Sequence, residues 1–522
     1  MSQSSKPEAG PASTGPASFS PHAPSNSLPH SSFPAPIYRD TVLVQIFEDA
    51  KRYFLAPLLA IQYAHTVMLA KQSIMTQQEA AQCIAALDAL DLDAVRGVIY
   101  DGSFEDLFFL MQQKLAEKCS PYLAGKMHTA RSRNDIDLTM YRMILRQRLL
   151  DAIAALVDLR RQLAALAWEH RASLMPAYTH NQPAQPTTLG HYLMAAIECF
   201  ERDVERLQAA YERVNRSPMG ACAITTTGFP IDRPYVASSL GFDGLQVNSY
   251  GAIASADYLT ESCSVLAVAM LNLGRLAQDL LQWSTVEFGY LRLSDGYVQV
   301  SSIMPQKRNP VPLEHIRILA SRALTQAHAV IASLHNTPFT DINDGEDDLQ
   351  PLVYTAFDDA VRSLRLTAGV LDEAEFTVDK MAASAEANFL TVTELADTLV
   401  RATTMDFRTA HEIVTRGVKE LDGEYDLERM ASAVERALAA HVPRFHVDPQ
   451  ALRKSLTASN FVAIRTIPGG PAPEALDPEI LRALDRCTED QVWLKTKQSH
   501  KKDAEDSLRH DCNQLLEQFP RR

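Results

Sequence analysis

The feature that most constrains the fold is a set of long segments in which apolar residues recur every three or four positions. Between residues 146 and 170 this spacing places one apolar row along a single helix face, formed by Leu149, Ile153, Leu156, Leu159, Leu163 and Leu166. A second segment has the same pattern, formed by Val265, Val268, Leu271, Leu276, Leu280 and Trp283. Alternating apolar and polar positions, which would predict strands, are scarce. The chain is therefore predicted to be mainly α, with a central bundle of long helices.

The chain is long enough for several packed units, because its 522 residues exceed the length at which a single core stops growing. Only 20 of these residues are glycine, which favours helices over turn-rich β structure. From the composition shifts we predict a disordered Pro/Ser-rich tail at 1–36, an N-terminal helical domain at 37–130, a central helix-bundle domain at 131–380, a C-terminal helical domain at 381–480 and a charged helical tail at 481–522.

Charge and cysteine usage exclude several classes of partner. The net charge of −14 argues against a nucleic-acid or anionic-membrane surface, because phosphate binding needs clustered Lys and Arg. The seven cysteines are scattered and form no C-x-x-C pair, as is usual for reduced thiols. No apolar run approaches a membrane span, and the first residues lack the layout of a signal peptide. We expect a cytoplasmic protein with no membrane partner.

A Pro-bounded loop at 300–310, VSSIMPQKRNP, carries several polar side chains close together. Lys307 and Asn309 supply a cation and an amide that can hold a carboxylate, next to Ser301 and Ser302. The loop has neither the G-x-S-x-G elbow nor the S-x-x-K spacing of acyl-transfer enzymes, so it does not indicate a nucleophilic serine. The alternative interpretation is a simple turn.

Two further clusters carry candidate functional side chains. In HTARSRND, residues 128–135, Arg133 and Asn134 stand just before a helical segment, where guanidinium groups and free N–H donors could bind a carboxylate. The alternative is a surface salt-bridge patch. In the Pro-rich turn that holds Thr179 and His180, the histidine is either a proton carrier or a structural residue.

These motifs, together with SPMGACAITTTGFPIDRP, FLTVTELADTLVRATTMDFRTAHEIV and IPGGPAPEAL, resemble argininosuccinate lyase of the fumarase/aspartase superfamily, over roughly residues 50–478. The resemblance implies a three-domain fumarase/aspartase-type fold whose bundle forms a 20-helix core in a homotetramer. It also implies active sites that are shared between three subunits. The implied reaction is reversible anti-elimination of fumarate from an N-substituted aspartate, a small dicarboxylate, with no metal and no organic cofactor.

The resemblance also implies a role for each matching residue. Ser301 is the base that takes the Cβ proton, with its hydroxyl pKa lowered by Lys307 and by backbone N–H donors. His180 transfers a proton toward the leaving amine and is oriented by Glu314. The remaining matches hold substrate carboxylates, and they are Lys307, Asn309, Arg133, Asn134 and Thr179, with Ser132 and Ser302 as second contacts.

The chain departs from the family pattern on the side of the leaving amine. The family's E-D-x-H is here Glu105 to Phe108, without the histidine. The family's Y-N-R/K-D-L/M-Q-E-D-K is here the segment 341–349, in which Tyr, Gln and Lys are replaced by Asp341, Glu346 and Leu349. Asp106, Asp341 and Glu346 are therefore the amine-side candidates.

Three hypotheses follow from these departures. The enzyme acts on argininosuccinate, or on an N-substituted aspartate whose amine part is cationic or lacks arginine's carboxylate, or the chain is a retired homologue with a structural role. Intact Ser301, Lys307, Asn309, His180 and Glu314 favour an enzyme.

Overall fold

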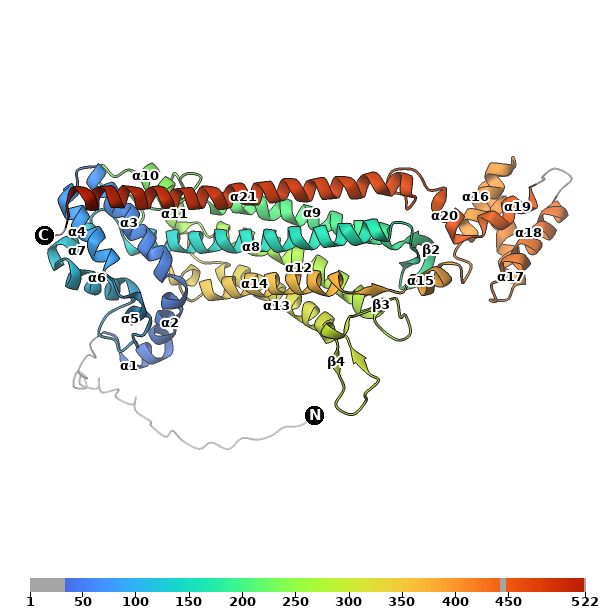
Figure 1. The fold of residues 1–522 in the computed structure, drawn as a ribbon, viewed down its shortest axis with the longest axis horizontal. Coiled ribbons are helices and arrows are strands. Elements are labelled where there is room, and N and C mark those ends of the chain that lie inside the picture. The colour runs from blue at the N-terminus through green and yellow to red at the C-terminus, as the bar shows by residue number, and fades with distance from the viewer. Residues whose placement is uncertain (1–32, 442–446, 521–522) are drawn as a thin grey trace, which may run out of the picture.

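The computed structural model describes residues 33–441 and 447–520. It forms an elongated bundle of long helices with a smaller helical unit at each end (Figure 1). The prediction of a mainly α chain is confirmed. Of the tail expected at 1–36, residues 1–32 lie outside the described residues, and Pro36 already begins the first short helix.

The central bundle consists of five long helices, namely α8 (Arg133–Glu169), α9 (Leu189–Val214), α12 (Asp257–Trp283), α13 (Val311–Leu334) and α14 (Gln350–Asp372). The predicted apolar row at 146–170 lies on α8 and is buried along its length. Helix α8 begins with a capping box, in which Ser132 and Asp135 satisfy each other's backbone N–H groups. Its 37 residues give it a length of about 55 Å, which sets the distance between the two ends of the bundle.

The second predicted apolar row divides between two faces of α12. Leu276, Leu280 and Trp283 are buried in the bundle, whereas Val268 and Leu271 are 39% and 56% exposed. The outward pair faces away from the chain's own core, so a single face was the wrong prediction for this segment. By length and composition α12 is the one unbent helix in the described chain that could cross a membrane, and it packs between α9, α13 and α14.

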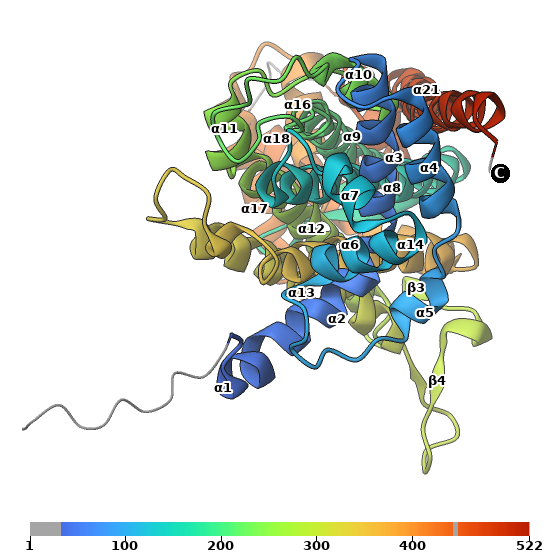
Figure 2. The ribbon, with the colours of Figure 1, turned by 90° about the vertical axis from the view of Figure 1, so that its left-hand side faces the viewer.

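The N-terminal unit packs against the start of α8 and consists of short helices, namely α1 (Pro36–Tyr38), a π-helical turn (Arg39–Leu43), α2 (Val44–Tyr53), α3 (Leu55–Lys71), α4 (Gln77–Asp88), α5 (Leu92–Arg96), α6 (Leu107–Lys118) and α7 (Pro121–Met127). Two further short helices, α10 (Arg233–Ser239) and α11 (Ser249–Ala254), lie at the same end (Figure 2).

The opposite end carries the C-terminal unit, which has a small apolar core of its own within residues 395–456. The helices after the bundle are α15 (Val378–Ala385), α16 (Val392–Ala402), α17 (Phe407–Glu420), α18 (Leu427–His441), α19 (Pro449–Ser455) and α20 (Ala458–Ala463).

The last helix, α21 (Pro473–Gln518), returns along the whole bundle to the N-terminal unit (Figure 1). The domain boundary expected at 480/481 lies inside this helix. Asp490 forms a 2.5 Å ion pair with Arg160 of α8, and both side chains are nearly inaccessible to solvent. Near its end, Asp511 accepts a hydrogen bond from Tyr235 and pairs with Lys71 of α3. Helix α21 therefore ties the N-terminal unit to the bundle.

Strands occur only as short antiparallel pairs in the described residues. These pairs are β1 (Leu174–Thr179) with β2 (Gln182–Thr188), β3 (Leu291–Arg292) with β6 (Glu375–Phe376), and β4 (Gln299–Val300) with β5 (Arg308–Asn309). Two of these pairs are hairpins that project from the bundle, and both carry predicted site residues.

Candidate functional site

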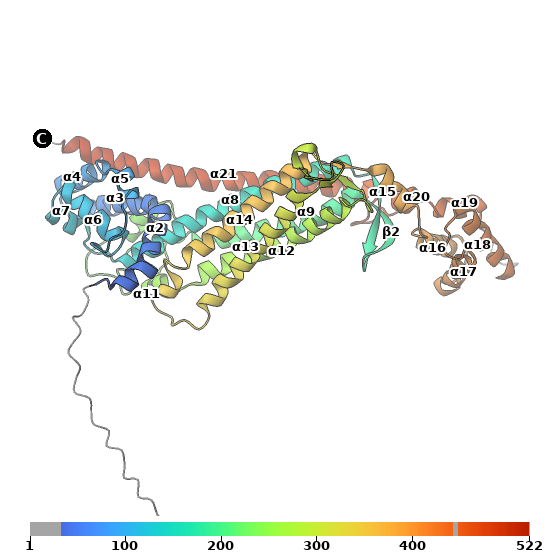
Figure 3. The ribbon, with the colours of Figure 1, turned by 90° about the horizontal axis from the view of Figure 1, so that it is seen from below.

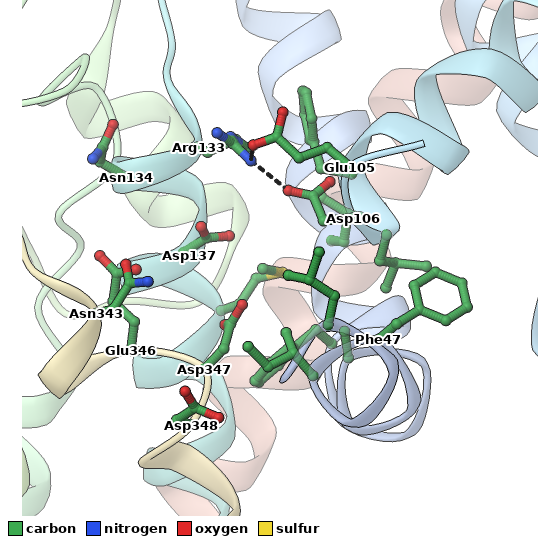
Figure 4. A pocket seen from close by; sticks show the side chains of 18 of the residues that line it. Phe47, Glu105, Asp106, Arg133, Asn134, Asp137, Asn343, Glu346, Asp347 and Asp348 are labelled. Atoms are coloured by element: carbon green, nitrogen blue, oxygen red, sulfur yellow. Dashed lines mark hydrogen bonds and ion pairs between the residues drawn. The ribbon is translucent and has the colours of Figure 1, made fainter. Parts of the chain in front are cut away.

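A pocket of about 360 Å³ opens where the N-terminal unit, the start of α8 and the 341–348 segment meet (Figure 4). The segment joins α13 to α14 and contains a 3-10 turn at Asn343–Gly345. Five of the predicted site residues line this pocket, namely Asp106, Arg133, Asn134, Asp341 and Glu346. A sixth, Ser132, donates a hydrogen bond to the Asn134 side chain. The structure therefore brings together residues that are more than 200 positions apart in the sequence.

Arg133 is engaged by the N-terminal unit. Its Nη1 donates to Glu105 Oε1 at 2.9 Å and to Asp106 Oδ2 at 2.6 Å, and its guanidinium lies over the Phe109 ring. Asp106 also caps α6, because its Oδ1 accepts the Phe109 N–H at 2.9 Å. The charge of Asp106, an amine-side candidate, is therefore balanced within the chain.

Asp341 and Glu346, which replace the family's Tyr and Gln, lie next to each other. The Asn134 amide donates to Asp341 and so connects the start of α8 to the 341–348 segment. Burial and the hydrogen bond with Asp341 raise the pKa of Glu346 to about 8. The two acidic side chains thus behave as a pair that retains a proton near neutral pH.

Sequence reasoning missed three further carboxyl groups in this pocket: Asp137, Asp347 and Asp348. Burial, with the nearby charge of Asp347, raises the pKa of Asp137 well above its ordinary range. Asp347 accepts a hydrogen bond from the Tyr141 hydroxyl. The spacing of Arg133 and Asp137 was a usable signal, because residues four apart share one helix face.

The opposite wall of the pocket is apolar and comes from the N-terminal helices. It includes Tyr38, Ile46, Phe47 and Phe54. No motif in the sequence pointed to these residues. The pocket therefore combines an acidic wall with a hydrocarbon wall.

The serine loop joins β4 to β5 in a hairpin that extends away from the bundle (Figure 2). Ser301 Oγ accepts the N–H of Met304 at 3.1 Å and that of Ile303 at 3.4 Å. These are backbone donors of the kind expected to stabilise a serine oxyanion. The Asn309 amide donates to the Gln299 carbonyl at 2.8 Å and closes the hairpin.

The other polar residues of this region are open to solvent. Ser302 and Lys307 are exposed on the loop, and Glu314 is exposed in the first turn of α13. Val300, which directly precedes the two serines, is in strand β4 and is 75% exposed.

Thr179 and His180 lie at the tip of the β1–β2 hairpin, which projects from the far end of the bundle (Figure 3). His180 and Asn181 have φ of 53° and 60°, and positive φ at both central residues is the geometry of a tight two-residue hairpin turn. Both side chains are exposed. Within the described chain, His180 and Glu314 are not hydrogen-bonded to each other.

The predicted site residues therefore occupy three separate places in one chain. The pocket at the start of α8 and the β1–β2 hairpin beyond its end are separated by the length of that helix, about 55 Å. The serine loop precedes α13, whose 24 residues span about 36 Å before the chain reaches Asp341. No single chain can close these groups around one small substrate.

The sequence of the chain is similar to those of known lyases. A family model described as "Lyase" matches residues 56–325, and one described as "Argininosuccinate lyase C-terminal" matches residues 389–463. "Argininosuccinate lyase 2" of Agrobacterium fabrum is 41% identical over 448 residues, which cover 85% of this chain and 89% of that protein. "Argininosuccinate lyase" of Methanoculleus marisnigri is 37% identical over 451 residues, covering 86% and 91%.

Among solved structures, an EDDS lyase variant with bound fumarate superposes with a TM-score of 0.82 at 30% identity, covering 93% of this chain and 96% of that one. A class II fumarase from Schistosoma mansoni shares the fold, with a TM-score of 0.64 at 14% identity, over 79% of this chain and 90% of that one. The chain is thus a carbon–nitrogen lyase that belongs to the argininosuccinate lyase family of the fumarase/aspartase superfamily.

Proposed function

We propose that this lyase releases fumarate reversibly from argininosuccinate or a related N-substituted aspartate, in active sites that three subunits of a homotetramer complete. The observation that carries the proposal is the placement of the polar residues in three separated groups on one chain, with the serine loop and the His180 hairpin exposed. The names of the relatives, argininosuccinate lyase and EDDS lyase, support the reaction class. We place the enzyme in the cytoplasm.

An uncovered apolar face supports assembly with further copies. Val268 and Leu271 of α12 and Ile318 of α13 are all more than a third exposed. A groove of about 730 Å³ runs between α9, α12 and α13 on this side. Apolar patches of this kind are typical of subunit interfaces, and further copies of the chain are the proposed cover.

The reaction begins with removal of the Cβ proton by Ser301. The Met304 and Ile303 N–H groups already point at its oxygen, and Lys307 on the same loop adds positive charge. Such donors stabilise the serine oxyanion, so a larger fraction of Ser301 is in the deprotonated form that can take the proton. Loss of the Cβ proton leaves an aci-carboxylate, which carries two negative charges on one carboxyl group. Hydrogen-bond donors that stabilise these charges lower the barrier to proton removal.

Residues from all three groups supply these donors. Asn309 uses one amide hydrogen on Gln299, and its second remains for the substrate. Arg133 retains N–H groups beyond the Nη1 that binds Glu105 and Asp106. The other proposed carboxylate contacts are Asn134, Thr179, Ser132 and Ser302.

His180 delivers the proton to the departing nitrogen, and Glu314 of another subunit orients its ring. A carboxylate next to an imidazole stabilises the imidazolium form, which is the form that acts as an acid. The exposed tip of the β1–β2 hairpin is available to a neighbouring subunit, whereas His180 makes no hydrogen bond to Glu314 within its own described chain.

The test is fumarate turnover by the purified protein, followed by the ultraviolet absorbance of fumarate. We expect fumarate from argininosuccinate or from another N-substituted aspartate, and fumarate consumption when an amine is added. Absence of turnover in both directions, with a panel of amines that includes arginine and ammonia, would contradict the proposed function.

A further inference from the structure

The pocket at the start of α8 is strongly acidic for a pocket that is expected to bind an anionic substrate. Seven carboxyl groups line it, whereas Arg133 is the only cationic side chain among the lining residues described. The seven are Glu105, Asp106, Asp137, Asp341, Glu346, Asp347 and Asp348. They come from the N-terminal unit, from α8 and from the 341–348 segment, so the fold assembles them from three distant segments (Figure 4).

Arg133 compensates only two of these carboxyl groups, namely those of Glu105 and Asp106. Asp341 and Asp347 accept hydrogen bonds from neutral donors, the Asn134 amide and the Tyr141 hydroxyl. Asp137 faces the cavity and makes no hydrogen bond or ion pair to any described residue. The pocket thus contains more acidic than basic side chains, and one of its carboxyl groups, that of Asp137, has no partner among the described residues.

Burial and repulsion between neighbouring carboxyl groups raise the pKa of two residues in this pocket. Both effects raise the pKa of Asp137, and burial with the Asp341 hydrogen bond raises that of Glu346 to about 8. A cation that enters the pocket favours the ionised form of such groups and is bound by them in return. A carboxylate on the amine part, placed beside Asp341 and Glu346, would instead be repelled by them.

The apolar wall limits the kind of cation. Tyr38, Ile46, Phe47 and Phe54 line the side of the cavity that faces the acidic segment. A ligand that fits both walls has a hydrocarbon body and at least one positive group. The volume of about 360 Å³ suits a small organic amine.

We propose that this pocket binds the amine half of the substrate, and that it selects a cationic amine with a hydrocarbon body and no carboxylate. The proposal rests on the proposed function, because Arg133 and Asn134 hold the aspartyl half at the rim of the same pocket. Glu346, Asp341 and Asp137 are the specificity-determining residues. Arginine, whose α-carboxylate would face these groups, is then a poor amine product.

Matched pairs of amines test this selection in the direction of addition to fumarate. Agmatine and arginine differ by one carboxylate, and so do putrescine and ornithine. We expect kcat/KM to be about tenfold or more higher for the carboxylate-free member of each pair, because like charges in a partly buried pocket repel strongly. Fumarate consumption is the readout, with ammonia as an amine that does not fill the pocket.

The possible outcomes separate the two proposals. Equal or higher kcat/KM with arginine and ornithine would overturn the selectivity and leave the lyase function intact. If no amine, ammonia included, consumes fumarate, both the function and the selectivity are refuted.

A charge-matched pair of variants locates the effect. Glu346→Gln should lower kcat/KM for agmatine about tenfold and leave the KM for fumarate unchanged. Asp344→Asn removes the same charge from an exposed side chain in the same segment that does not line the pocket, and it should change neither value. Asp137→Asn provides a second test if the Glu346 variant unfolds. Equal effects of the Glu346 and Asp344 variants would contradict the assignment.

Discussion

Two inactive variants should restore each other's activity when their chains are mixed. The variants are His180→Asn, at the tip of the β1–β2 hairpin, and Asn134→Ala, in the pocket at the start of α8. These positions lie at opposite ends of a helix about 55 Å long, so one chain cannot supply both groups to one substrate. Each active site must then take them from different subunits.

The expected activity of the mixture can be calculated. Loss of a general acid typically costs about 10²–10⁴-fold in rate, and loss of one donor to a developing oxyanion about 10²–10³-fold. Each parent should therefore be nearly inactive. In an equal mixture, half of the positions for each group are occupied by an intact chain, so about a quarter of the sites contain both intact groups. This fraction does not depend on the number of subunits.

The assay is fumarate turnover after co-expression of the two chains, or after joint dissociation and reassembly. Each parent treated alone is the first control. A mixture of wild type with the double variant is the second, and it should retain about a quarter of wild-type activity rather than the half expected if each site came from one chain. A mixture of the two single variants that stays as inactive as its parents would refute the assembly of sites from several subunits.

Three further predictions concern single positions. Ser301→Ala should abolish turnover while the oligomer, measured by light scattering, stays assembled; retention of most of the rate would mean that another group is the base. The pKa of Glu346 is raised from 4.5 to about 8 in the folded chain. Between pH 4.5 and 8 the folded chain therefore keeps a proton on Glu346 that the unfolded chain has already released. Its contribution to the free energy of unfolding is therefore complete below pH 4.5 and is lost as the pH rises through 8. The Tm of the amine-free enzyme should fall over this window, and less so in Glu346→Gln. Finally, Asp490→Ala leaves the buried Arg160 without its closest anion, which should cost about 3 kcal/mol in chemical denaturation; a loss below about 1 kcal/mol would show that Glu201, 3.5 Å from Arg160, suffices.

The helical bundle was predictable because burial on one face leaves a periodic record in the sequence. The row from Leu149 to Leu166 correctly predicted α8, since these residues pack within their own chain. The same reasoning assigned a single face to the α12 segment, where Val268 and Leu271 are exposed. Periodicity reports that a residue is apolar, and it cannot distinguish the chain's own core from a surface that a second copy covers.

The candidate site was predictable as a set of motifs but not as a set of contacts. The motif HTARSRND identified Arg133, yet its partners Glu105 and Asp106 lie 28 and 27 positions away, and nothing local indicates that they pair with it. Asp137 was detectable from helical spacing. The apolar wall was not, because Tyr38 and Phe47 belong to N-terminal helices whose position at this pocket depends on the whole fold.

The proposed division of the site among chains explains why the amine side departs from the family pattern while the fumarate side matches it. The proposed fumarate contacts come from the start of α8, the serine loop and the β1–β2 hairpin, which must converge from different subunits, so a change in one alters a geometry that the others depend on. The amine pocket is built within one chain, from the N-terminal unit, the start of α8 and the 341–348 segment. Asp341 and Glu346 alter its charge without touching the β4–β5 or β1–β2 hairpins, because helices of about 36 Å (α13) and about 55 Å (α8) lie between the pocket and these hairpins. Substitutions in this pocket can therefore change the departing amine and leave the proton-transfer groups in place.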